Sequence, residues 1–229
     1  MADIVLIRHG QASFGAADYD RLSAIGEEQS RRLGRWFRQT GQSPDAIATG
    51  SLRRHLRTAE LCMEAAGLDA TRIALAGLDE MDHEEVLARH RPDLAAPGAL
   101  AAEMMHADDP HRAFQRLYLD AVTRWVCGKF DSDYTRSWNT FRTDVMQALQ
   151  ELAALDAGTV WVFTSGGPIA VIANALVGAP VEQTFALAWP LVNTSITRIS
   201  ADAKRSRLIS YNGWPHLEAA GEADLITHR

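Results

Sequence analysis

The chain has 229 residues, of which 47% are hydrophobic and 23% charged, and its formal net charge is -6 at pH 7. This length and composition are typical of a globular protein with one large domain, with or without an insertion. The negative charge disfavours nonspecific nucleic-acid binding, which needs a basic surface, but a few local arginines can still bind a small anionic substrate.

The cysteines and apolar stretches narrow the class further. The two cysteines, Cys62 and Cys127, are too few for a disulfide framework. The sequence has no CxxC pair of the kind that binds zinc. Basic residues interrupt the first apolar run, so it does not have the pattern of a secretory signal. The uncharged stretch 157–181 is long enough for a membrane helix, but a Ser-Gly-Gly-Pro turn at 165–168 divides it. We therefore expect a cytoplasmic protein with no membrane partner.

The first third of the chain alternates strands and helices. The branched apolar residues of 4–7 predict a buried central strand. A helix is predicted over 22–40, with Ser23 as its N-cap and Gly41 ending it. The elements predicted next are a strand at 46–49, a helix at 52–66 that stops at Gly67, and a short strand at 73–75.

The middle of the chain reads as helical from about 84 to 155. Its clearest helix carries apolar residues at intervals of three and four, namely Trp138, Phe141, Val145, Leu149 and Leu152. The aromatic side chains of Trp125, Trp138 and Phe141 could line a pocket beneath a cap, but their helical spacing favours core packing. The elements predicted after it are a strand at 159–163, a helix at 169–177 and strands at 195–199 and 208–211.

Alternation of strands and helices at both ends predicts one α/β domain over 1–229. We expect a three-layer α/β/α sandwich with a mostly parallel sheet, in which the helical segment of about 84–155 is a cap insertion. Ligands of such sheets bind beyond the carboxyl ends of the strands, so the residues that follow 4–7 and 159–163 are the candidates for a site.

Arginine, histidine and glycine follow the first predicted strand directly. The guanidinium of Arg8 is a planar donor fork that matches phosphate oxygens, and His9 can act as a nucleophile, a base or a ligand. Gly10 would let a ligand approach the backbone closely. A solvated strand end is the competing interpretation, and this motif alone leaves the choice open.

A second group of arginines opens the helix predicted at 52–66. Positive charge is unfavourable there because the helix dipole is positive at the same end, and a bound anion would relieve the cost. A plain solvated basic face is the competing interpretation, and we expect Arg53 and Arg57 to belong to such a face.

Taken in order, these segments resemble the histidine phosphatase superfamily, whose fold is phosphoglycerate-mutase-like. The resemblance covers nearly the whole chain, and a family motif Ser-x-Leu-x-Arg-Ala-x-x-Thr-Ala aligns with residues 50–59. The matching segments are Arg8-His9-Gly10, Leu22-Ser23 with Gly26, Gln29-Ser30 and Leu33-Gly34, Gly50 to Ala59 with Arg54, Leu78-Asp79-Glu80, Asn193-Thr194-Ser195-Ile196 and His216-Leu217.

The resemblance implies a phosphomonoester hydrolase. The neutral ring of His9 would attack phosphorus to form a phosphohistidine, while Arg8 and Arg54 hold the non-bridging oxygens. Glu80, kept protonated by burial, would donate a proton to the leaving oxygen. No metal or other cofactor is needed, and the expected partner is a small phosphorylated substrate or phosphate ion. The expected phosphate-binding residues are Arg8, Gly10, Ser13, Arg54, Ser165 and Gly166.

The turn after the second strongly apolar strand departs from the family pattern. Ser165 stands where the family has a second histidine, and charge-assisted hydrogen bonds are about twice as strong as neutral ones. Losing such a donor could cost a factor of about 10² to 10³ in rate. The N–H groups of Gly166 and Gly167 could still hold an anion, so binding should survive better than turnover. His83 or His55 could supply the missing charge.

Three alternatives remain open at this stage. The chain could be a phosphate-binding pseudoenzyme, because the serine removes a charged donor. It could be a phosphoglycerate mutase, although the insertion is acidic around 103–109 rather than basic. It could be a serine hydrolase, with Ser165, Asp202 and His216 in the right order, although Phe163 breaks the Gly-x-Ser-x-Gly pattern. The sequence does not indicate the oligomeric state.

Overall fold

The structure, a computed structural model, describes residues 2–13, 20–69, 71–96, 98–202, 204–218 and 223–228. The chain divides into two compact units. Unit 1 comprises residues 1–80 and 144–229, and unit 2 comprises residues 81–143. No helix in the described ranges combines the length and apolarity that crossing a bilayer requires.

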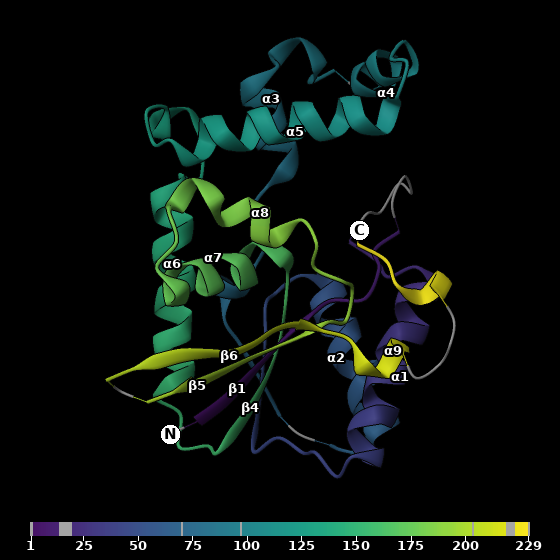
Figure 1. Cartoon of the computed structure of the whole chain (residues 1–229), viewed down its shortest axis with the longest axis vertical. Coiled ribbons are helices and arrows are strands. Elements are labelled where there is room, and N and C mark those ends of the chain that lie inside the picture. Colours follow the sequence, from purple (N-terminus) through teal and green to yellow (C-terminus); the bar gives the residue numbers. More distant parts are fainter. Residues whose placement is uncertain are drawn as a thin grey trace. The chain divides into compact units, whose positions relative to one another are not determined.

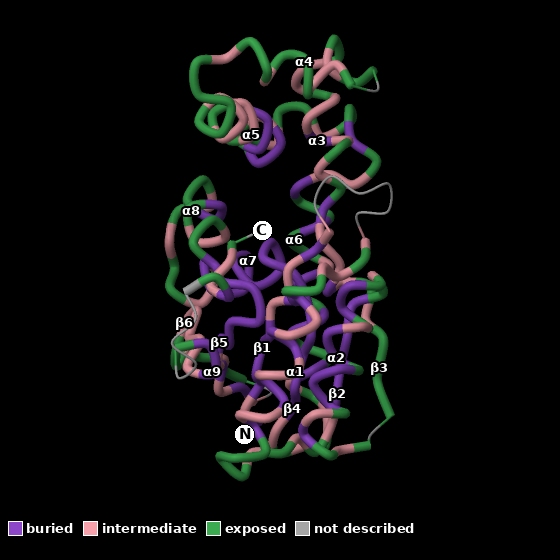
Figure 2. The backbone as a smooth tube through the Cα atoms, turned by 90° about the vertical axis from the view of Figure 1, so that its right-hand side faces the viewer, coloured by how far each residue is buried: buried purple, intermediate pink, exposed green. Residues whose placement is uncertain are grey.

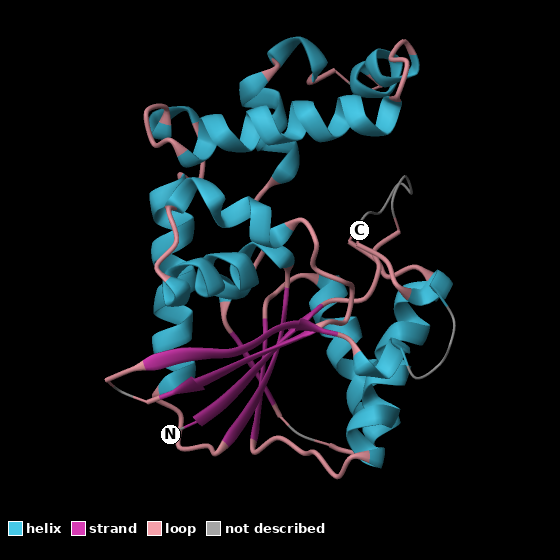
Figure 3. Cartoon of the chain, in the orientation of Figure 1, coloured by secondary structure: helices cyan, strands magenta, loops and turns pink. Residues whose placement is uncertain are grey.

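The described strands of unit 1 form one six-stranded sheet in the order β3-β2-β4-β1-β5-β6 (Figure 1, Figure 3). The strands are β1 (Ala2–Arg8), β2 (Ala46–Thr49), β3 (Arg72–Ala74), β4 (Thr159–Thr164), β5 (Ile196–Ala201) and β6 (Ser206–Gly213). β1 to β4 are parallel, whereas β5 and β6 are antiparallel to their neighbours. Arg8 pairs with Thr164 and Thr49 with Phe163, so β1, β4 and β2 end at the same edge.

Helices cover both faces of this sheet. α1 (Ala24–Gln39), α2 (Arg53–Ala66) and α9 (Pro215–Glu218) lie on one face. α7 (Gly166–Val177) and α8 (Thr184–Ala188) lie on the other (Figure 1). The short 3₁₀ segments are Ala76–Leu78, Pro92–Leu94, Asp131–Asp133, Val181–Gln183 and Ala223–Leu225. The predicted three-layer α/β/α fold with a mostly parallel sheet is therefore confirmed.

The core of unit 1 lies around the two central strands. Residues 4–7 of β1 are fully buried, as expected for a parallel strand covered on both faces (Figure 2). Phe37 of α1 stacks on Trp161 of β4, with ring centroids 3.9 Å apart. This aromatic contact joins the α1–α2 layer to the sheet.

The helix boundaries follow from their caps. Ser23 accepts the N–H of Gly26 at 3.1 Å and starts α1, and Gly67 ends α2 in the left-handed conformation. α7 begins at Gly166, earlier than the predicted start at 169, because Pro168 is tolerated within the first turn of a helix. The sequence also missed α8 and α9, which have only five and four residues.

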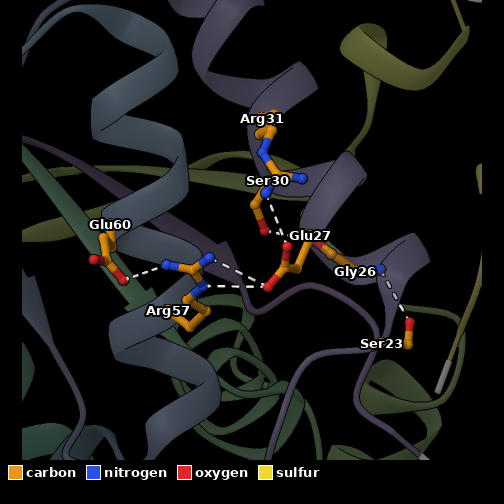
Figure 4. Close-up of polar contacts among 7 residues, drawn as sticks. All are labelled: Ser23, Gly26, Glu27, Ser30, Arg31, Arg57 and Glu60. Carbon is orange, nitrogen blue, oxygen red and sulfur yellow. Dashed lines mark hydrogen bonds and ion pairs between the residues drawn. The ribbon is translucent and has the colours of Figure 1, made fainter.

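A partly exposed group of ion pairs joins α1 to α2. Arg57 contacts Glu27 of α1 at 3.3 Å and Glu60 of α2 at 2.8 Å (Figure 4). Arg31 also contacts Glu27, at 2.8 Å. Arg57 therefore lies on a partly solvated helix face, as predicted for this arginine.

Unit 2 is helical. Its helices are α3 (His83–His90), α4 (Ala99–Met105), α5 (Pro110–Val126) and the first part of α6 (Trp138–Ala153). Trp125 packs on Trp138 and Phe141, at centroid distances of 5.2 and 5.4 Å, and all three rings are buried. These aromatic residues thus form the core of the unit.

The unit boundary falls within α6, whereas the predicted insertion extends to about 155. The later part of α6 belongs to unit 1. A β-carbon on Gly77 would lie 2.5 Å from the carbonyl oxygen of Asp144 and 3.0 Å from the β-carbon of Ala148. This close backbone approach, which only glycine allows, holds the later part of α6 to unit 1.

Candidate active site

Three strand ends of unit 1 bring the predicted residues together. Arg8 ends β1 and His9 follows it, Arg54 opens α2 after β2, and Ser165 follows β4. Because the register aligns these three ends, residues far apart in the sequence meet at one edge of the sheet.

His9 is buried and neutral. Its Nδ1 lies 2.7 Å from the carbonyl oxygen of Gly10, so Nδ1 carries the proton and donates it. This tautomer leaves the lone pair of Nε2 available. Burial lowers the pKa of the ring well below its ordinary value, and the charges of Arg54 and Arg8, followed by His55, lower it further. The ring can therefore act as a nucleophile at neutral pH.

Backbone carbonyls orient the guanidinium of Arg8. Its Nη1 donates to the carbonyl oxygens of Leu191 and His228, the second at 3.0 Å. A β-carbon on Gly166 would lie 3.8 Å from Nε of Arg8, so the guanidinium lies beside the start of α7. The guanidinium of Arg8 thus lies at the end of β1, close to the turn that follows β4.

A carboxylate orients Arg54. Its Nη1 donates to Oδ1 of Asp20 at 2.7 Å, and the Arg54 side chain is almost completely buried. The second oxygen of Asp20 accepts the N–H of Arg53 at 2.8 Å. An anion was predicted at the positive start of α2, and in the structure the carboxylate of Asp20 occupies that place.

Glu80 lies at the start of α7. Its Oε2 accepts the N–H of Gly167 at 3.0 Å, which places the carboxyl group next to the turn that contains Ser165. The side chain is half-buried rather than buried as predicted. The bond also engages one of the two N–H groups that were predicted to hold an anion.

Gly10 and Ser13 contribute less directly than predicted. A β-carbon on Gly10 would lie 2.4 Å from the carbonyl oxygen of Gly26, and its N–H donates to Oγ1 of Thr58 at 3.0 Å. The glycine is therefore needed for close packing of α1, which accounts for it without a ligand. Ser13 donates its N–H to the carbonyl oxygen of Arg21 at 2.8 Å.

Ser165 contacts a histidine, but from a different element than the family pattern suggests. Its Oγ lies 2.6 Å from Nε2 of His55, and both side chains are fully buried. The His55 and His9 ring centroids are 5.7 Å apart. The other candidate, His83, bonds to the hydroxyl of Tyr118 at 2.6 Å within unit 2.

The hypothetical triad of Ser165, Asp202 and His216 does not form. His216 bonds through Nε2 to Oγ1 of Thr194 at 2.9 Å. The carboxylate of Asp202 accepts the N–H groups of residues 204 and 205 in the turn between β5 and β6. Both residues are thus engaged elsewhere, so the structure does not support the serine hydrolase alternative.

Sequence reasoning also missed several supporting residues. Asp20 carried no recognisable signal. Thr58 and Asn193 lie in the motifs that resemble the family, but no role was given to them. Asn193 donates from Nδ2 to the carbonyl oxygen of His9 at 3.1 Å, which helps fix the backbone of the nucleophile.

A model of the histidine phosphatase superfamily (branch 1) matches residues 4–213. The chain belongs to this superfamily. Its relatives include 2,3-bisphosphoglycerate-dependent phosphoglycerate mutases. The protein from Thermobifida fusca is 41% identical over 75 residues, 30% of each chain. The protein from Corynebacterium kroppenstedtii is 30% identical over 153 residues, 55% of this chain and 60% of the relative. The matches thus span less than two thirds of these relatives.

Solved structures of a mutase and a phosphatase share the fold over nearly the whole chain. Phosphoglycerate mutase from Bacillus anthracis superposes with a TM-score of 0.64 at 16% identity, covering 96% of this chain and 97% of the other. Phosphoserine phosphatase from Entamoeba histolytica, in complex with 3-phosphoglyceric acid, gives a TM-score of 0.63 at 19% identity, covering 95% and 100%. The predicted phosphoglycerate-mutase-like fold is confirmed.

Proposed function

We propose that the chain is a phosphomonoester hydrolase that forms a phosphohistidine on His9. The state of this buried ring carries the proposal, because Nδ1 is bonded to Gly10 and the neutral ring keeps Nε2 available. Arg8 and Arg54 are close enough to lower the pKa of the ring, so two guanidinium groups lie near the nucleophile. Such groups balance the charge of a transferring phosphoryl group. The substrate is a small phosphorylated molecule.

The reaction has two steps. Nε2 of His9 forms a bond to phosphorus while the ester P–O bond breaks, and the leaving oxygen takes the electron pair and a proton from Glu80. Water then attacks the phosphohistidine, Glu80 takes up a proton from it, and the N–P bond breaks to release phosphate and neutral His9. The N–H of Gly167 holds the Glu80 carboxyl group at the start of α7, and this bond favours the carboxylate form that takes up the proton of water in the second step.

A 2,3-bisphosphoglycerate-dependent mutase is the second candidate, because the curated relatives carry that name. The acidic character of residues 103–109 in unit 2 favours the hydrolase, since retention of a bisphosphate calls for basic side chains. Isomerisation of 3-phosphoglycerate in the presence of 2,3-bisphosphoglycerate would identify the mutase, and release of inorganic phosphate would identify the hydrolase.

The experiment traps the intermediate. Wild-type protein is mixed with p-nitrophenyl phosphate, quenched at alkaline pH, and the phosphorylated residue is located by mass spectrometry. We expect phosphate on His9, and we expect His9→Gln to lose turnover by a factor of about 10³ or more. His111→Gln, a change at an exposed histidine of α5, is the control. Wild-type turnover in His9→Gln would overturn the proposal, and phosphate binding without turnover would identify a pseudoenzyme.

A further inference from the structure

A second buried imidazole lies beside His9. His55 belongs to the first turn of α2, directly after Arg54, and its side chain has no exposed surface. The ring centroids of His9 and His55 are 5.7 Å apart. His55 therefore approaches the nucleophile from the end of β2, the neighbour of β4 in the sheet. An imidazole in this position can take part in the charge balance of the site.

His55 contacts the turn after β4 through Ser165. The distance of 2.6 Å between Nε2 and Oγ is that of a short, direct hydrogen bond. Only one of these two atoms can donate at a time. The protonation of the His55 ring therefore determines the direction in which the hydroxyl proton of Ser165 points.

A carboxylate lies behind the ring. Nδ1 of His55 is 3.7 Å from Oδ1 of Asp79 and makes no hydrogen bond within the described ranges. Asp79 accepts the N–H and the hydroxyl of Ser51, at 2.6 and 2.5 Å. A β-carbon on Gly50 would lie 2.3 Å from Nδ1 of His55 and 2.5 Å from Oδ1 of Asp79, so only glycine keeps this edge free. The carboxylate favours a proton on Nδ1, which leaves Nε2 to accept from Ser165.

A bound phosphoryl group would change this arrangement. In the unliganded site the His55 ring is neutral, because burial and then the charge of Arg54 lower its pKa well below the ordinary value. A phosphoryl dianion beside the ring opposes both effects, since negative charge favours the protonated imidazole. Nε2 then takes up a proton from solution and donates to Oγ of Ser165. The hydroxyl proton of Ser165 turns toward a phosphoryl oxygen.

We propose that His55 and Ser165 act as one unit that presents a charge-assisted donor to the phosphoryl group transferred to His9. Ser165 is the catalytic residue that touches the phosphoryl oxygen. His55 is the positioning residue behind it, and Asp79 holds the ring. This inference rests on the phosphomonoester hydrolase function proposed above.

The experiment uses variants that remove the imidazole at position 55, after β2, and introduce one at position 165, after β4. It compares kcat and KM of Ser165→Ala, His55→Ala, their double variant and His55→Ala/Ser165→His with p-nitrophenyl phosphate. Each single variant should lose about a hundredfold in kcat, the value of one preorganised donor. The double variant should lose no more than either one, because residues that act as a unit are not additive. Recovery of at least about tenfold is expected in His55→Ala/Ser165→His, because charge-assisted donation returns.

A purely structural role would produce neither the non-additivity nor the recovery. Ser195→Ala is the matched control, because Ser195 is fully buried and its hydroxyl has no hydrogen-bond partner within the described residues. Its kcat should match the wild type. Additive losses in the double variant, or no recovery in a folded His55→Ala/Ser165→His, would overturn the proposal.

A further variant keeps the test decisive if His55→Ala does not fold, as judged by thermal unfolding. His55→Gln can still donate to Ser165 but cannot take up a proton, so its kcat should fall by about a hundredfold. Full kcat in folded His55→Gln would overturn the inference alone, provided that His9→Gln is inactive. A wild-type protein whose turnover does not depend on His9 would overturn the inference and the proposed function together.

Discussion

Three buried neutral histidines should make unit 1 sensitive to mild acid. The pKa of each of His9, His55 and His216 lies below its ordinary value, with burial as the main cause, and that of His216 is lowered to about 3. Below pH 6.5 the unfolded chain binds protons that the folded chain does not, so stability present above that pH is lost as the pH falls toward the lower pKa values. Each histidine then costs about 1 kcal/mol between pH 6 and pH 5, and the three together cost about 3 kcal/mol.

Urea unfolding of the whole protein between pH 5 and pH 7.5 measures this loss. His216→Gln removes one of the three histidines and should reduce the fall between pH 6 and pH 5 by about one third, to about 2 kcal/mol. Carboxylates titrate mainly below this window, so they do not mask the effect. A fall of less than about 1 kcal/mol in the wild type, or an unchanged fall in His216→Gln, would show that these rings are not neutral in the folded state.

Further changes test other parts of the structure. Arg57→Ala should lower the free energy of unfolding by less than about 1 kcal/mol in urea titrations, because its ion pairs are partly exposed; a larger loss would contradict this. Native protein should react rapidly with a thiol reagent only at exposed Cys127, because Cys62 is buried and burial raises its pKa. Rapid reaction of both thiols would contradict the burial of Cys62. Gly26→Ala should lower the free energy of unfolding by about 3 kcal/mol, since its β-carbon would lie 2.2 Å from the carbonyl oxygen of Gln11. If the Gly26→Ala variant had the urea midpoint of the wild type, α1 would be able to shift away from Gln11 at little cost.

Local signals made the first half of the fold predictable. β1 was recognised because a central parallel strand needs a continuous apolar run, and α1 because Ser23 is a typical N-cap. α8 was missed because its five residues are too few for a helical period to be visible. The site could be located from strand ends alone, since parallel strands end together.

The role of individual side chains was harder to predict. His55 and Arg54 lie on the buried face of α2 together with Thr58, so that face is polar where it meets the site. Such a face cannot be distinguished from a solvated basic surface by periodicity, because both are polar. Only the position of α2 beside the ends of β1 and β4 reveals that His55 is inside.

The same geometry leads to one more prediction, about related sequences. The family motif that aligns with residues 50–59 has serine and alanine at the positions of Gly50 and His55, and the family turn has histidine at the position of Ser165. The space between these positions is small, because His55 and Ser165 are fully buried 2.6 Å apart and a β-carbon on Gly50 would overlap the ring. This space holds one imidazole ring, which can belong either to residue 55 or to residue 165. Relatives with serine at 165 should therefore carry histidine at 55 and glycine at 50, and relatives with histidine at 165 should carry a small residue at 55. Sequences that frequently combine histidine at both positions would show that the two rings do not compete for one volume.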